Sequence, residues 1–127
     1  MAIRTELGLT LPNRVGALGQ VCDALAAGRI TLVALSQETG GTLRVIVDNP
    51  PRAAAILREQ HHQVDERDVL YATVPNEPGA LSRTVRLVAD AGINVEYAYA
   101  TGVETQPMAS VVIGVADAQA ASAASGI

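Results

Sequence analysis

Two asparagines, Asn13 and Asn76, stand at matching places of a motif that this 127-residue chain contains twice. The copies read Pro-Asn-Arg-Val-Gly-Ala-Leu from position 12 and Pro-Asn-Glu-Pro-Gly-Ala-Leu from position 75. Asn is a good helix N-cap, and the N-terminus of a helix attracts carboxylates. The motif therefore predicts either a plain helix cap or a cap that faces an anion, and both interpretations remain open at this point.

The motif has the composition of a strand-to-helix turn. The prolines at 12 and 75 end a strand because they have no N–H to donate, and Pro78 suits the first turn of a helix. Gly16 and Gly79 carry no Cβ, so another backbone or a ligand could come close. An internal repeat of this length indicates two copies of one structural unit.

Metal and thiol chemistry find little support in the sequence. The single cysteine, Cys22, excludes an internal disulfide and a paired-thiol metal site, and it fits a reducing cytosol. His61 and His62 are adjacent, would point apart on an extended chain and have no third ligand nearby in sequence, so a solvated helix end is the better interpretation. We expect no metal and no cofactor.

An acylphosphatase-like hydrolase is the enzymatic alternative, because Arg14 could hold a phosphate among backbone N–H groups. The counterpart of Arg14 in the repeat is the acid Glu77, which would repel the same substrate, and the glycine-rich phosphate loop of that family is missing. No Ser lies on a nucleophile-type turn. We expect a protein that is not an enzyme.

Charge and composition limit the partners. All nine basic residues are Arg, they form no basic run, and the formal net charge is −4. The chain also lacks Phe and Trp, which argues against base stacking and against nucleic acid as a partner. No apolar run is long enough to span a membrane. We expect a cytoplasmic protein.

Hydrophobic periodicity predicts the same order of elements in both halves. In the first half, the expected elements are a strand at 3–11, a helix from the Asn13 cap to Gly28, strands at 30–37 and 42–47, a helix opening at 48–51 and a closing strand within 62–67. In the second half, they are a strand at 69–74, a helix from 81 to about 92, strands at 93–101 and 108–115, and an Ala-rich helix capped by Asp117 and ending near 125. No residues then remain for a closing strand.

The order β-α-β-β-α-β is the ferredoxin-like arrangement, an antiparallel sheet with two helices on one face. The sequence thus predicts an α+β protein of two tandem ferredoxin-like units, residues 1–67 and 68–127, with the second unit lacking its last strand. Either nothing replaces that strand, or another element covers the exposed edge. An uncovered edge favours pairing with a second chain, so a homodimer is expected.

The segment Asn76-Glu77-Pro78-Gly79-Ala80-Leu81, followed by a helix and by Ala91-Gly92-Ile93-Asn94-Val95, closely resembles the ACT domain. This family comprises amino-acid-sensing βαββαβ modules found on phosphoglycerate dehydrogenase, aspartokinase and the small subunit of acetolactate synthase. The resemblance covers essentially the whole chain, twice.

The resemblance implies an amino acid held between two such units, by an Asn in the loop after the first strand and an Asn at the start of the second strand. Asn13 and Asn76 match the loop Asn, whereas Asn94 and, in the first unit, Thr31 stand at the strand position. Asn13 would then face Asn94, and Asn76 would face Thr31. We expect the first site to bind more tightly, because an amide suits an α-amino and α-carboxylate pair better than one hydroxyl does. The implied ligand-binding residues are Asn13, Arg14, Val15, Gly16, Ala17, Leu18, Thr31, Asn76, Glu77, Pro78, Gly79, Ala80, Leu81 and Asn94, with Val15 standing where the family pattern has Pro.

The sequence therefore predicts a regulatory protein that binds a small amino acid and acts on a partner in trans, such as a metabolic enzyme. Two alternatives stay open. One is an assembly module whose turns are mere caps, and the other is the hydrolase described above.

Overall fold

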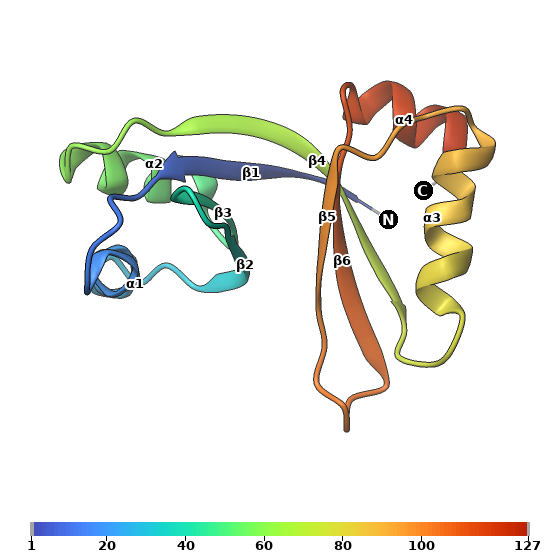
Figure 1. Ribbon diagram of the computed structural model, residues 1–127, viewed down its shortest axis with the longest axis horizontal. Coiled ribbons are helices and arrows are strands. Elements are labelled where there is room, and N and C mark those ends of the chain that lie inside the picture. The colour runs from blue at the N-terminus through green and yellow to red at the C-terminus, as the bar shows by residue number, and fades with distance from the viewer. Residues whose placement is uncertain (1, 127) are drawn as a thin grey trace. The chain divides into compact units, whose positions relative to one another are not determined.

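The computed structural model describes residues 2–126, which form an α+β fold of six strands and four helices (Figure 1). The expected tandem ferredoxin-like arrangement is confirmed. In chain order the elements are β1 (Ala2–Thr10), α1 (Ala17–Ala27), β2 (Leu32–Gln37), β3 (Thr42–Val47), α2 (Pro50–Glu59), β4 (Asp65–Pro75), α3 (Ala80–Asp90), β5 (Tyr97–Thr101), β6 (Met108–Gly114) and α4 (Ala118–Ser125).

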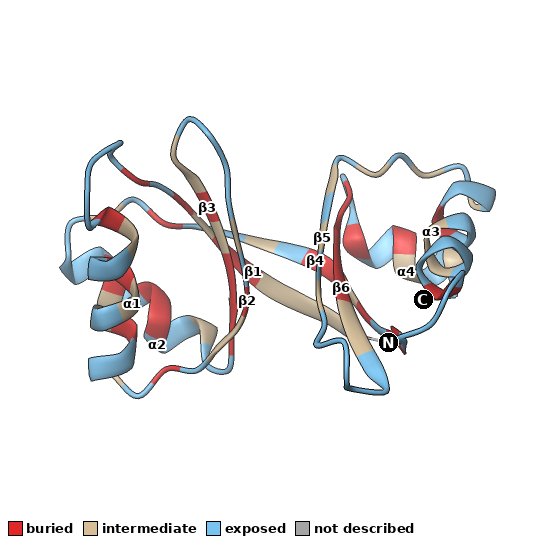
Figure 2. Ribbon diagram, turned by 60° about the horizontal axis from the view of Figure 1, so that its bottom comes forward, coloured by how far each residue is buried: buried red, intermediate tan, exposed pale blue. Residues whose placement is uncertain are grey.

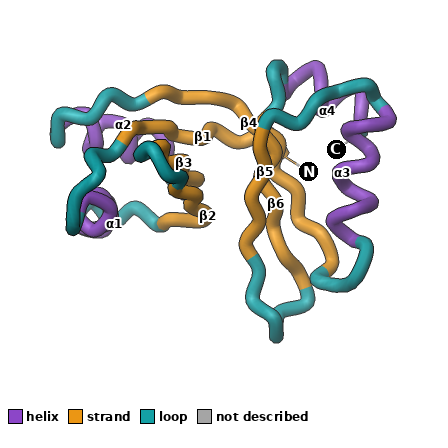
Figure 3. The backbone as a smooth tube through the Cα atoms, viewed as in Figure 1, coloured by secondary structure: helices purple, strands orange, loops and turns teal. Residues whose placement is uncertain are grey.

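The chain divides into two compact units. The N-terminal unit is residues 5–67, in which the strands lie in the order β2-β3-β1 with antiparallel pairing. The C-terminal unit is residues 2–4 together with 68–126, in which the order is β4-β6-β5, again antiparallel. In each unit the two helices lie on the same face of the sheet (Figure 3).

The structure differs from the sequence prediction at the end of the first half, where strand β4 lies. The closing strand expected within 62–67 begins only at Asp65 and continues without a break to Pro75. Residues 65–67 belong to the N-terminal unit, where a Cβ on Gly8 would lie 4.0 Å from the Asp65 carbonyl oxygen, and residues 68–75 belong to the C-terminal unit. No Gly, Pro or Asn interrupts the chain between the two segments, so nothing ends the strand there.

Part of strand β1 joins the C-terminal unit, for which the sequence predicts no closing strand of its own. Its residues 2–4 are part of the C-terminal unit, where Ile3 packs against the core and the Arg4 guanidinium carbon lies 4.7 Å from the centre of the Tyr71 ring. Over the described residues no strand follows α4. The sequence left open whether another element replaces the missing closing strand. The structure shows that it does, because residues 2–4 of β1 join the C-terminal unit.

Each unit buries its own aliphatic core between sheet and helices (Figure 2). In both, the alternate residues of the first strand point into the core, as the sequence pattern predicts. The core residues of the N-terminal unit include Leu7, Leu9, Leu11, Val21, Leu25, Leu43, Val45 and Leu57. Those of the C-terminal unit include Leu70, Ala72, Val74, Val88, Val111, Ile113 and Val115.

Strand β5 begins later than the predicted 93–101. Tyr97 pairs with Gly114, the last residue of β6, and the Glu96 N–H still donates to Gly114 O at 2.8 Å, so residues 93–95 lie beyond the end of that ladder. Ile93 and Val95 still pack against the core, whereas Asn94 is exposed. The Tyr97 ring instead lies over Gly114, where an added Cβ would come within 2.3 Å of the ring.

Candidate functional site

The repeated turn differs from the Asn-capped helix start that its composition predicts. The N-caps of α1 and α3 are Gly16 and Gly79, with φ of +86° and +83°, and neither makes a side-chain capping bond. Since glycine adopts positive φ without a Cβ penalty, it turns the chain into the helix. The asparagine three residues earlier is released from capping, and Pro78 precedes α3 rather than lying in its first turn.

Asparagine does cap a helix elsewhere. Asn49 Oδ1 accepts a hydrogen bond from the Arg52 N–H at 3.3 Å, and Asp117 Oδ1 accepts one from the Ala120 N–H at 3.0 Å, as expected for these two helix starts. The side chains of Asn13 and Asn76, by contrast, cap no helix.

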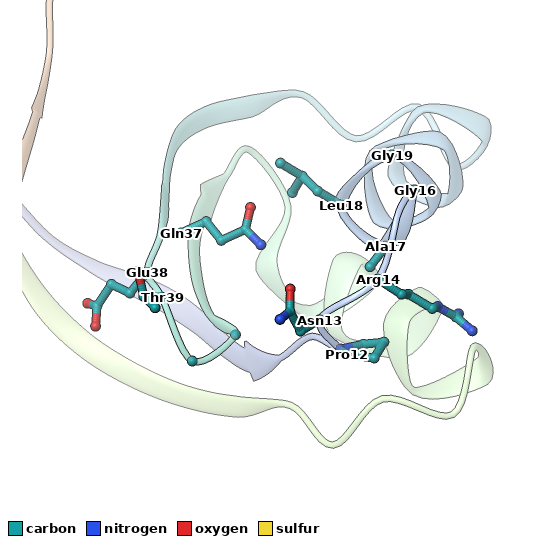
Figure 4. A pocket seen from close by; sticks show the side chains of 12 residues that line it. Pro12, Asn13, Arg14, Gly16, Ala17, Leu18, Gly19, Gln37, Glu38 and Thr39 are labelled. Atoms are coloured by element: carbon teal, nitrogen blue, oxygen red, sulfur yellow. The ribbon is translucent and has the colours of Figure 1, made fainter.

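A pocket of about 500 Å³ lies in the N-terminal unit between the repeated turn and the β2–β3 connection (Figure 4). The side chains of Asn13, Gln37 and Leu18 point toward one another across it, while those of Arg14 and Glu38 point away (Figure 4). We call it the Asn13 pocket. Its lining residues are Pro12, Asn13, Arg14, Gly16, Ala17, Leu18, Gly19, Gln37, Glu38, Thr39, Gly40 and Gly41.

The charged side chains at this pocket are engaged elsewhere. Arg14 Nη2 donates to Gln20 Oε1 at 3.1 Å, and the Glu38 carboxylate pairs with Arg44. Within residues 2–126, the Asn13 side chain has no hydrogen-bond partner. The pocket therefore offers an unused amide, with two N–H donors and one oxygen acceptor, beside a second amide from Gln37.

The C-terminal unit has a pocket of about 230 Å³ at the equivalent position, which we call the Asn76 pocket. Here the N–H donors of Asn76 are all engaged: its Nδ2 donates to the carbonyl oxygens of Val103 and Gln106, both at 3.0 Å, and its main-chain N–H donates to Pro107 O at 2.8 Å. Glu77 pairs with Arg83 at 3.1 Å. The lining residues are Val74, Pro75, Asn76, Glu77, Leu81, Ala100, Thr101, Gly102, Ala109, Ser110 and Val111.

Comparison with known families agrees with this duplicated architecture. Residues 1–119 match the family model described as an ACT domain pair. The chain belongs to the ACT domain pair family. The resemblance seen in the sequence is thereby confirmed.

Solved structures share the fold of this ACT pair. Protein BT0572 from Bacteroides thetaiotaomicron is 30% identical, with a TM-score of 0.86 over 96% of this chain and 85% of that chain. The regulatory subunit of aspartate kinase from Thermus thermophilus, in its ligand-free form, is 19% identical, with a TM-score of 0.69 over 98% of this chain and 95% of that chain. A putative C-terminal regulatory domain of aspartate kinase from Porphyromonas gingivalis is 16% identical, with a TM-score of 0.65 over 98% and 92%. Among proteins with curated descriptions, none matches this sequence.

Neither a metal-binding cluster nor a membrane-spanning helix is found among residues 2–126. No group of three or more His, Cys, Asp or Glu in the described part of the chain could hold a metal ion. None of the helices between residues 2 and 126 combines the length and apolarity needed to cross a bilayer.

The residues predicted to bind the ligand divide into three groups. Those at the Asn13 pocket are Asn13, Arg14, Gly16, Ala17 and Leu18. Those at the Asn76 pocket are Asn76, Glu77 and Leu81. Those that line neither pocket are Val15, Thr31, Pro78, Gly79, Ala80 and Asn94. Val15 is fully exposed, Ala80 is buried, and the Thr31 N–H donates to Asp48 Oδ1 at 3.0 Å.

Sequence reasoning missed the hairpin end that forms the opposite wall of each pocket. In the ACT pair β1 runs antiparallel to β3, and Thr10 at the end of β1 pairs with Thr42 at the start of β3. The connection that precedes Thr42 must therefore lie beside the turn that follows Thr10. Two consecutive glycines, Gly40 and Gly41, are typical of a hairpin connection, and together with the predicted strand order they could have placed Gln37 beside Asn13.

Proposed function

We propose that this ACT pair is a regulatory protein that binds a small amino acid in the Asn13 pocket and passes that signal to a partner. The observation that carries the proposal is the unused amide of Asn13 in a pocket of about 500 Å³. Ligand pockets typically measure roughly 300–1,000 Å³, a range that includes the Asn13 pocket and excludes the Asn76 pocket.

The chemistry of the pocket suits a zwitterion. The amide N–H groups of Asn13 and Gln37 can donate to an α-carboxylate, and their oxygens can accept from an α-ammonium group. Because Arg14 and Glu38 point away, no unbalanced charge faces the ligand (Figure 4). Leu18 offers an apolar contact for a side chain. A neutral amino acid of modest size fits these features.

The output of such a sensor requires a second protein. Solved structures with this fold are described as regulatory subunits or regulatory domains of aspartate kinase, and we propose a comparable role in trans on a metabolic enzyme, with a homodimer as the working assembly. No catalytic role is proposed. The pairing of Asn13 with Asn94 stays a prediction.

A screen of the twenty amino acids by thermal shift tests the proposal. A ligand that binds only the folded protein adds about 2.7 kcal/mol of stability at a hundredfold excess over Kd. We expect at least one amino acid to raise the melting temperature in a concentration-dependent way. A flat response to all twenty at millimolar concentration would favour the assembly-module alternative instead.

Replacing Asn13 by alanine should weaken binding of that amino acid by about 1–3 kcal/mol, or about 5- to 150-fold in Kd, because the ligand loses its amide partner. The control is Asp23→Ala, which changes an exposed residue of α1 outside the pocket. Isothermal titration calorimetry measures both variants, and equal affinity in Asn13→Ala and Asp23→Ala would refute the role given to Asn13.

A further inference from the structure

We infer that only one of the two repeat-related pockets takes an amino acid, because the β5–β6 connection of the protein itself occupies the recognition donors of the other. This inference rests on the proposed function and deepens it, since it fixes the number of ligands per chain at one and places the ligand in the Asn13 pocket.

The hydrogen bonds of Asn76 carry the inference. An asparagine amide has two N–H donors, and both Nδ2 donors of Asn76 are used, one on Val103 O and one on Gln106 O, each at 3.0 Å. The main-chain N–H of Asn76 is used as well, on Pro107 O at 2.8 Å. A carboxylate arriving at Asn76 would find no donor left, whereas at Asn13 the amide is unused.

The difference arises from the lengths of the two hairpins. Gln37 pairs with Leu43, six positions on, whereas the equivalent Ala100 pairs with Val111, eleven positions on. The second hairpin thus carries five additional residues. The carbonyl groups that bind Asn76 come from within this longer connection, residues 102–107, and the Gln106 N–H donates to Val103 O at 2.8 Å, so the connection is folded on itself. In the described residues, the shorter β2–β3 connection makes no hydrogen bond to the Asn13 side chain, although it lines the same pocket.

The polarity of the Asn76 pocket points the same way. Charge does not distinguish the two pockets, because Arg14 is bonded to Gln20 and its counterpart Glu77 is paired with Arg83. Where the Asn13 pocket has the Gln37 amide, the Asn76 pocket has the methyl group of Ala100. The Asn76 pocket is therefore the less polar of the two, so a ligand admitted there by shortening the connection would bind more weakly than one in the Asn13 pocket.

The test is the number of binding sites measured by calorimetry on the intact chain, using the amino acid that gives the largest thermal shift. We expect one site per chain in the wild-type protein, and two in a variant that lacks residues 103–107, whose shortened hairpin matches the first. Two sites in the wild-type chain, or still one site in a folded deletion variant, would overturn the inference.

The variant Asn76→Ala keeps the test decisive if the deletion variant does not fold. We expect this variant to bind one ligand within twofold of the wild-type Kd, while exchange of the Gln106 N–H, which donates within the connection, rises about tenfold because the Asn76 amide no longer anchors it. Loss of ligand binding in Asn76→Ala, or unchanged exchange in that connection, would contradict the inference. A wild-type chain that binds no amino acid refutes the proposed function instead, and the exchange measurement then still decides whether Asn76 holds the connection.

Discussion

Leu7→Ala is expected to destabilise the N-terminal unit by about 2–5 kcal/mol, because the truncation leaves a cavity in a closely packed core. Leu7 is completely buried and contacts the core of residues 5–67. Chemical denaturation gives the loss of stability, and hydrogen exchange followed by mass spectrometry locates it. We expect faster exchange in β1 and β3, with α3 and β6 changed much less.

Ile3→Ala truncates another apolar residue of β1, at the end that belongs to the C-terminal unit. It tests whether this strand contributes to both units. Ile3 is half-buried and packs against the core of the C-terminal unit, so we expect a smaller loss of about 1–2 kcal/mol. Exchange should rise in β4 and β6 although these strands lie more than sixty residues away in sequence. If Ile3→Ala instead loosened only the elements of residues 5–67, the assignment of residues 2–4 to the C-terminal unit would be wrong.

Gly41→Ala is expected to cost about 2–5 kcal/mol and to impair ligand binding, since Gly41 forms part of the wall of the Asn13 pocket. Its φ is +93°, and an added Cβ would lie 2.3 Å from the Leu11 carbonyl oxygen, which belongs to backbone and cannot move aside cheaply. The Leu11 N–H also donates to Gly41 O at 2.7 Å, so a shift of either residue breaks this bond.

Gly40→Ala separates the cost of backbone strain from the cost of the collision with Leu11. Gly40 has a similar φ of +100° but nothing within 4 Å of an added Cβ, so this variant carries the backbone strain without the collision. We expect it to cost about 1–2 kcal/mol. Urea denaturation of both variants checks the difference, and equal losses would show that the contact with Leu11 is not what requires glycine at position 41.

The sequence was sufficient to predict most of the fold because the pattern repeats. The alternation of Leu7, Leu9 and Leu11 with polar residues specifies a half-buried strand, and the capping residues Asn49 and Asp117 mark two helix starts correctly. What it could not show is that β1 and β4 each contribute to both units. Strand sharing depends on which backbone pairs with which, and alternation along one strand carries no information about its neighbours.

The candidate site was predicted in part. The repeat located both turns, but the capping role of Asn13 and Asn76 was wrong, because the left-handed glycines that follow them begin the helices. Gln37 was missed because its distance from Asn13 is set by sheet register. The sequence predicted unequal sites from Asn94 and Thr31, which line neither pocket, whereas the hydrogen bonds that occupy Asn76 come from a connection whose path no local pattern specifies.

The most direct test of the central claim is a crystal structure of the intact chain grown with the amino acid that stabilises it most. We predict one ligand per chain in the Asn13 pocket, with its carboxylate within hydrogen-bonding distance of Asn13 Nδ2. Electron density for the ligand at Asn76, with the Asn13 pocket empty, would contradict it.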